Sequence, residues 1–349
     1  DVLVIERDEA GMAASTANAG SLHVQLLSSD FGEDGPEDGG PAGHMLPLAP
    51  QSIALWKEIA AEAGEDLGIR TEGGLMVADS EPAMRWLRKK SEMEQQLGIE
   101  SHVLGTNELR NLAPAISERM IGADFVPAEG YGDPLRGTMA VLKLALKAGV
   151  RIMQGTEAQG LAREGSSWVV TTSRGEVRAG KVVNATGPRA GAIGGMIGLR
   201  LPVRGTVQQV IATEPVPQQM TRHLIAYAKR HLSLKQQPSG GFLVGGGWFG
   251  EVDPATGRTR NLRRSVEGNL WVCGQVLPAL RALHFIRSWT GLSPVTDRAP
   301  ILGEAPGVPG FFNVVSGNGY TLAPILGRLT AEAVQGRRVD PRYTLTRFG

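Results

Sequence analysis

The sequence predicts an α/β fold in which a parallel-sheet domain is interleaved with an α+β domain built on an antiparallel sheet. Continuous apolar runs, typical of parallel strands buried on both faces, recur at the start, middle and end of the chain. These runs are residues 2–5, 181–185 and 311–315. Between them, residues 202–213, 231–236 and 242–246 are typical of strands of a second, antiparallel sheet. Because the two kinds of strand alternate along the chain, we expect two interleaved domains rather than two in series.

Composition argues against several functional classes. The 349 residues include 36 Lys or Arg and 35 Asp or Glu, and the net charge of +1 gives no electrostatic reason to expect a nucleic-acid partner or an anionic membrane. No apolar run reaches the roughly 18 residues of a membrane-spanning helix, so no direct membrane span is predicted. The single cysteine cannot form an internal disulfide, and the six histidines show no metal-ligand spacing. We therefore predict a cytoplasmic protein without a metal site.

The chain begins inside a strand. The apolar run 2–5 follows Asp1 directly, without an initiator Met or a polar lead-in, and we expect that the sequence is cut at its N-terminus. This strand ends at Glu6, and a stretch of mainly small residues follows at 11–20. Residues 30–43 are acidic and rich in Gly and Pro, which predicts a mobile surface loop.

Helices are predicted from apolar spacing and from capping residues. Residues 48–63 fit an amphipathic helix, and residues 81–97 a charged surface helix. Asp133 followed by Pro134 is typical of a helix start, and that helix is expected to end at Gly149. The last helix is expected over residues 322–334.

The remaining expected strands are short. Residues 74–78 are predicted as one of them, and residues 150–153, 168–172 and 177–178 alternate like antiparallel strands. The turn at residues 238–241 is expected to join the strands 231–236 and 242–246 into a hairpin.

The acidic residue that ends the first strand is a candidate ligand for a ribose. In a dinucleotide-binding fold, the acid at the end of the second strand accepts hydrogen bonds from ribose hydroxyls, although Glu6 taken alone is better interpreted as an ordinary charged residue. The glycine fingerprint of such folds belongs about 20 residues earlier, which is before residue 1. The one formal match within the chain, Gly245, Gly247 and Gly250, does not lead into a helix and is interpreted as the end of a hairpin.

Two buried strands end in small residues. The first runs into Asn184-Ala185-Thr186-Gly187, where the backbone can touch a ligand, and a tight turn explains the pattern equally well. After residues 311–315, Gly317 and Gly319 stand at the start of the last helix, where free N–H groups and the helix dipole favour an anion or an electron-rich carbonyl. A closely packed glycine-rich connection is the alternative. The order of buried strand, glycine turn and helix favours a binding function.

Several motifs occur together in a specific order. They are Glu6-Arg7, ASTANAG at 14–20, Asp133-Pro134, NATG at 184–187, RSWTGL at 287–292 and GNGY at 317–320. This ordered set resembles the D-amino acid oxidase family of FAD-dependent oxidoreductases over the whole chain, especially the glycine oxidase, sarcosine oxidase and amino-acid dehydrogenase branches. The end of the chain is most similar to the flavin subunits of the hydrogen cyanide synthase, opine oxidase and hydroxyproline dehydrogenase type.

The resemblance implies a division into domains and a set of FAD contacts. A Rossmann-like FAD-binding domain would comprise residues 1–45, 126–200 and 291–349, without its first strand and glycine loop, and residues 46–125 and 201–290 would bind the substrate. Glu6 would hold the adenosine ribose, with Arg7 beside it. The other implied contacts are Ser15, Thr16, Asn18, Ala19, Gly20 and Leu22 along the pyrophosphate and flavin edge, Ala158 at the adenine, Ala185, Thr186 and Gly187 near the pyrophosphate, and Gly317, Asn318, Gly319, Tyr320 and Thr321 facing the isoalloxazine carbonyl.

The substrate side departs from the family pattern. Many relatives have an Arg at the position of Ser293, and in glycine- and D-amino-acid-type oxidases this Arg clamps the substrate carboxylate. Ser293 cannot do so, which leaves Arg298 or Arg287 as possible substitutes. The substrate-side candidates are Asn318, Tyr320, His23 and Arg298. Cys273 lies in an expected helix outside the flavin motifs, so FAD is expected to be bound non-covalently.

The resemblance implies an FAD-dependent amine or amino-acid oxidase or dehydrogenase. A hydride would pass from the carbon that bears nitrogen in a small amino or imino acid to flavin N5, and an imine would form. The alternative is a non-catalytic or truncated structural subunit of a hetero-oligomeric flavoenzyme, motivated by the absent first strand and glycine loop. A nicotinamide-dependent dehydrogenase is a third alternative, but it does not account for the helix start at residues 317–321.

Overall fold

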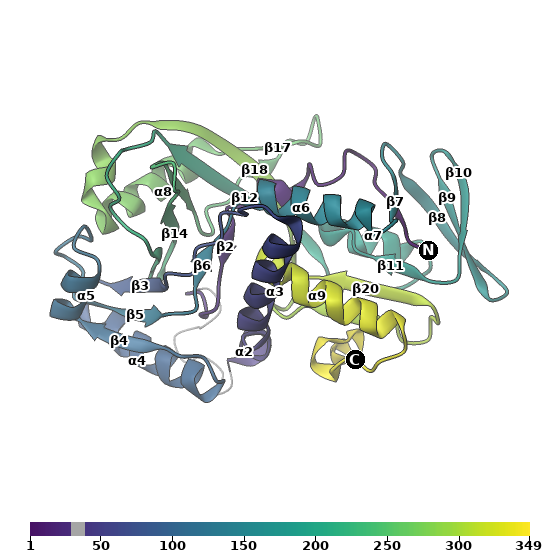
Figure 1. The fold of residues 1–349 in the computed structure, drawn as a ribbon, viewed down its shortest axis with the longest axis horizontal. Helices are drawn as coiled ribbons and strands as arrows, with labels where there is room; N and C mark the ends of the chain where they lie inside the picture. The colour runs from purple at the N-terminus through teal and green to yellow at the C-terminus, as the bar shows by residue number, and fades with distance from the viewer. Residues whose placement is uncertain (29–38) are drawn as a thin grey trace.

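The largest sheet of the protein has eight strands, seen on the left of the computed structural model, which describes residues 1–28 and 39–349 (Figure 1). Their order is β18-β12-β15-β14-β13-β3-β5-β4. In chain order they are β3 (Gly74–Ala78), β4 (His102–Gly105), β5 (Gly122–Val126), β12 (Arg204–Thr213), β13 (Leu224–Tyr227), β14 (Arg230–Gln236), β15 (Phe242–Gly245) and β18 (Phe285–Val295). All neighbours are antiparallel except the parallel pair β13 and β3. The predicted antiparallel sheet and its β14–β15 hairpin are confirmed.

Helices cover both faces of this sheet. On one face, α8 (Arg263–Val276) packs in a core that contains Leu234 and Phe242. On the other face, α3 (Leu48–Ala63) and α4 (Glu81–Gln96) belong to a second large core, which continues towards the parallel strands. The second face of the sheet therefore looks towards the rest of the molecule, and this is where a site between the two halves can form.

Parallel strands lie on the other side of the molecule, on the right in Figure 1. There, β1 (Leu3–Ile5) pairs in parallel with β7 (Arg151–Met153), and β11 (Val182–Asn184) pairs in parallel with β20 (Phe311–Val315). The mixture of parallel pairs on this side and an antiparallel sheet on the other confirms the α/β fold with interleaved elements.

One strand prediction was wrong in direction. Residues 150–153 were expected to form an antiparallel strand, but β7 runs parallel to β1. The reason is α6 (Pro134–Lys147), which precedes β7 directly and returns the chain as a crossover helix, so that the next strand runs in the same direction as β1. Its start is confirmed: the Asp133 side chain accepts hydrogen bonds from the backbone N–H groups of Leu135 and Arg136.

The remaining elements are shorter or connect these units. The helices are α1 (Ala14–Ala17), α2 (Gly40–Met45), α5 (Thr106–Leu112), α7 (Ala190–Gly195) and α9 (Gly319–Val334). In the described part of the chain, 3₁₀ turns occur at Gly187–Arg189, Pro278–Ala282, Pro341–Tyr343 and Leu345–Phe348. The strands are β2 (Ser21–Leu22), β6 (Gly130–Tyr131), β8 (Ala158–Glu164), β9 (Ser167–Thr172), β10 (Gly175–Ala179), β16 (Glu251–Val252), β17 (Thr259–Arg260) and β19 (Ile301–Glu304).

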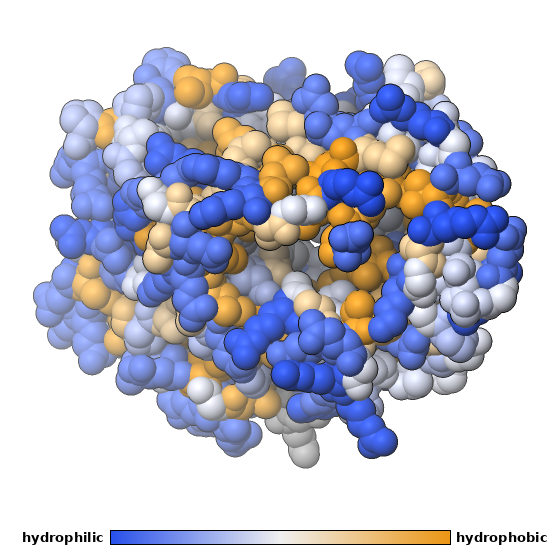
Figure 2. All heavy atoms as spheres, turned by 45° about the vertical axis from the view of Figure 1, so that its right-hand side comes forward, coloured by the Kyte–Doolittle hydropathy of each residue, from blue (hydrophilic) through white to orange (hydrophobic). Residues whose placement is uncertain are grey.

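Two parallel strands each have an edge without a partner among the described residues. β1 pairs only with β7, and β11 pairs only with β20. Large apolar side chains near these edges are exposed, by 57% at Val2, 41% at Val4 and 42% at Val183. Figure 2, which brings this side of the molecule forward, shows hydrophobic residues gathered around a hollow. Apolar exposure at open strand edges is typical of a surface that accepts another strand or helix.

The structure bears on two further expectations, the loop at residues 30–43 and the domain boundary at residue 291. A loop was expected at residues 30–43, and residues 30–38 of it lie outside the described part. The loop prediction for residues 40–43 was wrong, because α2 begins at Gly40 with Pro41 in its first turn. The proposed domain boundary at residue 291 falls inside β18, which pairs with β12 continuously on both sides of Gly291.

The described part of the chain contains no helix that is both long and apolar enough to cross a membrane. Within the same residues, no group of three or more His, Cys, Asp or Glu side chains is arranged to hold a metal ion.

Candidate functional site

The acidic end of β1 is held firmly by the strand beside it. Glu6 N–H donates to the Met153 carbonyl at 3.0 Å, and the Glu6 carbonyl accepts from Thr156 N–H at 2.8 Å. The Glu6 carboxylate accepts from the backbone N–H of Asp8 at 2.8 Å, so its position at the strand end is fixed. Arg7 points elsewhere and pairs with Asp8, at 2.9 Å.

The loop after β1 is shaped by its own polar side chains. Thr16 Oγ1 donates to the Gly11 carbonyl at 2.9 Å, and Asn18 Nδ2 donates to the Ser15 carbonyl at 2.7 Å. Asn18 Oδ1 in turn accepts from Gly20 N–H at 2.8 Å. These bonds explain why the small polar residues at these positions form a compact turn that leads into β2.

Gly20 is required where this loop meets β6. Its φ of +74° is in the left-handed region, and a Cβ would lie 2.1 Å from the Gly132 carbonyl oxygen. Gly132 N–H donates to the Gly20 carbonyl at 2.8 Å, which ties the two segments together. Two further candidates of this loop differ in exposure. Ala19 is half-buried, and Leu22 is fully buried in the second large core.

A single hydroxyl joins this loop to the start of α9. Thr321 Oγ1 donates to the Ser21 carbonyl at 3.1 Å and accepts from the backbone N–H of His23 at 3.1 Å. Thr321 is fully buried. The predicted flavin-edge loop and the predicted flavin-facing helix start, far apart in sequence, are therefore in direct contact.

The N-terminus of α9 is arranged as a group of donors. The first N–H groups of an α-helix have no acceptor within the helix and carry its positive dipole end. Asn318 is the N-cap residue, and its N–H donates to Ser316 Oγ at 3.2 Å. A Cβ added to Gly319 would meet nothing within 4 Å, while one on Gly317 would lie 3.1 Å from the Pro294 carbonyl oxygen. The backbone here can approach a ligand closely.

Tyr320 does not follow the expectation of a substrate-side group. Its ring packs beside Trp56 with centroids 5.1 Å apart, and Trp56 Nε1 donates to the Tyr320 carbonyl at 2.9 Å. The hydroxyl group is buried without a partner among the described residues, and a Cβ on Gly132 would lie 2.7 Å from it. Burial raises the pKa of Tyr320. This packing favours a structural role for the side chain.

The residues expected near adenine and pyrophosphate lie at strand ends. Ala158 begins β8, where it lies opposite Thr172. Thr186 Oγ1 donates to Asn184 Oδ1 at 2.8 Å, directly after β11. Ala185 is exposed. Gly187 has a φ of +55°, and a Cβ there would meet nothing within 4 Å, so this turn also presents open backbone.

His23 is the substrate-side candidate with a defined polar environment. Its Nδ1 lies 3.3 Å from Glu129 Oε1. Glu129 is fixed by the backbone N–H groups of Val24 and Gln25, at 3.0 and 3.3 Å, and by Gln25 Nε2 at 2.5 Å. This buried carboxylate therefore orients the imidazole from one side.

The arginines proposed to replace the missing clamp lie on the surface. Arg298 is exposed in a turn with a φ of +86°. Arg287 is also exposed, and its guanidinium lies over the Trp289 ring, 5.6 Å from the centroid. Neither arrangement brings a buried cation towards the junction of Ser21 and Thr321.

Sequence analysis missed two buried lysines. Lys90 and Lys235 are both fully buried, and no other Lys or Arg among the described residues is buried. Lys90 Nζ lies 2.8 Å from Glu94 and 2.6 Å from Asp124, so the helix expected to be a charged surface helix has a charged pair inside the protein. Lys235 Nζ donates to Ser21 Oγ at 2.8 Å.

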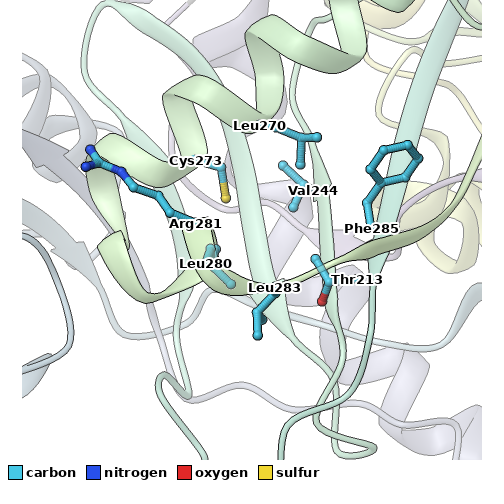
Figure 3. A pocket seen from close by; sticks show the side chains of 8 residues that line it. All are labelled: Thr213, Val244, Leu270, Cys273, Leu280, Arg281, Leu283 and Phe285. Carbon is cyan, nitrogen blue, oxygen red and sulfur yellow. The ribbon is translucent and has the colours of Figure 1, made fainter.

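A cavity of about 160 Å³ lies elsewhere, on the α8 face of the large sheet (Figure 3). It is lined by Thr213, Val244, Leu270, Cys273, Leu280, Arg281, Leu283 and Phe285. None of the predicted site residues contributes to it. Cys273 lies in α8, which confirms its expected place in a helix; it is 1% exposed, and burial raises the pKa of its thiol. This cavity is therefore not the site assembled above.

The donor and acceptor groups fit an FAD molecule. An acid at the end of β1 suits ribose hydroxyls, and the open glycine backbone at Gly187 suits close approach of a pyrophosphate. The start of α9 offers N–H groups to an electron-rich carbonyl, next to a buried junction with the loop 18–22.

Comparison with known proteins gives consistent results. A family model described as FAD dependent oxidoreductase matches residues 1–333. Glycine oxidase from Geobacillus kaustophilus is 29% identical over 99% of this chain and 89% of that protein. The sarcosine oxidase beta subunit of Rhodobacter capsulatus is 24% identical over 79% of this chain and 69% of that subunit. The crystal structure of glycine oxidase from Geobacillus kaustophilus superposes with a TM-score of 0.87, at 25% identity, over 99% of this chain and 92% of that one.

Proposed function

The chain belongs to the family of FAD-dependent oxidoreductases, and from this premise we propose that it oxidises the C–N bond of an amino acid, secondary amine or imino acid to an imine. The observation that carries the proposal is the Thr321 hydroxyl, which joins the loop 18–22 to the start of α9. The groups proposed to face the flavin are thereby linked to β14 of the large sheet, because Ser21 also accepts a hydrogen bond from Lys235 in that strand.

The residues proposed to hold FAD follow from this geometry. Glu6 offers a fixed carboxylate to the ribose, and the turn at Ala185, Thr186 and Gly187 lies at the end of a parallel strand, where ligands bind in such sheets. FAD held by these residues would supply the acceptor for a hydride from the substrate carbon. No thiol approaches these residues, because the single cysteine, Cys273, belongs to α8 and is buried in the core on that face of the large sheet, which supports non-covalent binding.

The protein groups orient the substrate and exclude water. The start of α9 would present a fixed positive dipole to the flavin ring, which would stabilise negative charge there without any movement of the protein. His23 is held by Glu129 and is the proposed polar group on the substrate side, together with Asn318 at the helix cap. The buried contact between Thr321 and Ser21 closes one side of the site against solvent.

The relatives support a small amino or imino acid as the substrate class. They include glycine oxidases, sarcosine oxidase beta subunits and a hydrogen cyanide synthase subunit. Two of these names denote subunits of larger assemblies. We therefore include partner subunits in the proposal.

An absorbance spectrum tests the proposal. The chain is purified, FAD is added, and glycine, sarcosine, proline and hydroxyproline are then supplied without oxygen. Flavin bands that bleach with one of these compounds support the proposal and identify the substrate class. A flavin that none of a broad set of amino and imino acids reduces would contradict it. If the chain retains no FAD, the structural-subunit alternative is favoured.

A further inference from the structure

Lys235 carries a buried amine without an anionic partner among the described residues. Its side chain is 0% exposed near the end of β14, and it forms no ion pair with any described residue. Its Nζ donates to Ser21 Oγ at 2.8 Å, which leaves further N–H groups of the ammonium available. Burial lowers its pKa to about 7. Since an unpaired buried charge is costly, the residue needs a compensating role.

The contrast with Lys90 shows that this is unusual. Lys90 is equally buried, but Glu94, Asp124 and Gln25 surround its ammonium, at 2.8, 2.6 and 3.1 Å. The two carboxylates balance its charge within the protein. The same fold therefore surrounds one buried lysine with carboxylates and gives the other no carboxylate partner among the described residues.

Lys235 lies on the face of the sheet that looks towards the proposed flavin site. Its neighbour Leu234 packs in the α8 core on the opposite face. Ser21 connects the two regions, because its hydroxyl accepts from Lys235 and its carbonyl accepts from Thr321. Ser233, two residues before Lys235 on the same face, has its hydroxyl 3.1 Å from Ser21 Oγ.

The titratable groups around Lys235 do not supply the missing charge. On the adjacent strands β13 and β15, the one titratable residue is Tyr227, whose hydroxyl donates to Asp79 at 2.5 Å. On the segment after β2, His23 is engaged with Glu129. On α9, the nearest titratable side chain in sequence to Thr321 is Tyr320, which packs against Trp56.

We propose that Lys235, Ser21 and Ser233 bind the carboxylate of the substrate, with Lys235 as the positive charge. Ser21 is only half-buried, so its hydroxyl can donate to a carboxylate while it accepts from Lys235. The group replaces the arginine clamp that Ser293 cannot form. The inference rests on the proposed function and deepens it, because it identifies the feature of the substrate that is recognised.

Calorimetric titration of the FAD-loaded full chain with benzoate tests the inference. Benzoate offers a carboxylate but no C–N bond to oxidise. At pH 8, in two buffers of different ionisation enthalpy, the wild type is expected to take up close to one proton per benzoate, because binding an anion recharges the Lys235 amine. Lys235→Met is expected to weaken benzoate by at least about tenfold and to abolish proton uptake. The wild type and Lys235→Met are expected to bind benzamide, which is neutral, with similar affinity.

A stability measurement separates this role from a purely structural one. Removing an unpaired buried charge is expected to raise the Tm of the unliganded protein by about 2 °C or more. Ser21→Ala is expected to weaken benzoate and retain proton uptake. The control Lys143→Met, at an exposed lysine that pairs with Glu65, is expected to change neither property.

The outcomes also separate this inference from the proposed function. If Lys235→Met leaves benzoate affinity and proton uptake unchanged, or if it alters only the flavin spectrum, the carboxylate site is wrong. If the wild type does not bind benzoate, it is wrong as well. If benzoate binds through Lys235 but no amino or imino acid reduces the flavin, the carboxylate site stands and the proposed oxidation fails.

Discussion

Thr321 Oγ1 donates a 3.1 Å hydrogen bond to the carbonyl oxygen of Ser21, a residue 300 positions earlier in the chain. The same oxygen accepts from His23 N–H at 3.1 Å, so one buried hydroxyl satisfies two backbone groups of the segment after β2. Because α9 begins at Gly319, this contact fixes the start of the helix relative to the loop proposed to hold the flavin. The contact therefore couples the packing of α9 to the position of the loop proposed to hold FAD.

Thr321→Val is expected to lower the free energy of unfolding by about 1–3 kcal/mol, because the Ser21 carbonyl and the His23 N–H lose their partner in a buried place. The affinity for FAD is expected to fall as the loop loosens. Denaturant unfolding and fluorescence titration with FAD measure the two effects.

The matched control for this variant lies on the same helix. Thr330 is also buried, but its hydroxyl donates to the Leu326 carbonyl within α9, at 2.6 Å. Thr330→Val is expected to cost less than Thr321→Val and to leave FAD affinity unchanged. Equal FAD affinities for the two variants would show that the junction does not position the cofactor loop.

Gly20→Ala is expected to destabilise the protein by more than about 2 kcal/mol, because a left-handed φ is costly for Ala and its Cβ would overlap the Gly132 carbonyl oxygen. The backbone must move to relieve this overlap, so FAD binding is expected to be lost with it. The measurements are thermal unfolding and the flavin content after purification.

Gly64→Ala separates the cost of a left-handed backbone conformation from the cost of an atomic overlap. Gly64 has a similar φ of +66°, but a Cβ there would meet nothing within 4 Å. Its cost is expected to be only that of the left-handed conformation, about 1 kcal/mol, with normal flavin content. If both variants retained flavin equally, the close approach of Gly20 and Gly132 would have no bearing on the cofactor.

Sequence patterns predicted the elements whose signals are local. The Asp133-Pro134 start of α6, the span of α3 and the β14–β15 hairpin were confirmed, because capping, apolar periodicity and turn composition are encoded in neighbouring residues. The direction of β7 was missed, because strand direction depends on the partner and not on the strand itself.

The buried lysines show where local patterns fail. Lys90 and Glu94 have the i, i+4 spacing of an exposed helical pair. Their burial comes from the packing of α4 over β3 and β5 and from the contacts with Gln25 and Leu26. Along β14, Ser233 and Lys235 alternate with Leu232 and Leu234, so the face that carries Ser233 and Lys235 would be predicted to be exposed in an isolated sheet. That face is covered by Ser21, from a segment more than 200 residues away. The contacts of Glu6, Thr186 and Asn318 with FAD stay predictions.

Lys90→Met is expected to lower the free energy of unfolding by about 3–5 kcal/mol, because Glu94 and Asp124 would be left as uncompensated buried carboxylates. The triple variant with Glu94→Gln and Asp124→Asn is expected to recover much of this loss, since no unpaired charge remains. Urea unfolding at pH 7 compares them.

The control for the Lys90 variant is a surface pair with the same spacing. Arg263 and Glu267 form an i, i+4 pair in α8, at 2.7 Å, on the outside of the protein. Arg263→Met is expected to change stability little. A similarly small effect of Lys90→Met would mean that the buried network does not support the fold.

The pH dependence of stability provides a test of Glu94 itself. Burial raises the pKa of Glu94 to about 7, the charge of Lys90 opposes this shift, and the charge of Asp124 adds to it. The folded protein then holds a proton on Glu94 more tightly than the unfolded chain does, where the pKa is near 4.5. The stabilisation is therefore complete below pH 4.5 and is lost as the pH rises towards 7.

Glu94→Gln isolates this contribution, because an amide does not titrate and can retain the hydrogen bond that Glu94 Oε1 accepts from Leu26 N–H at 2.6 Å. Between pH 4.5 and 7, the wild type is expected to lose up to about 3 kcal/mol relative to the variant, at no more than about 1.4 kcal/mol per pH unit. Urea unfolding at half-unit pH steps measures the difference. Two curves that stay parallel across this window would show that Glu94 does not exchange a proton there, and that the network keeps one ionisation state from acid to neutral pH.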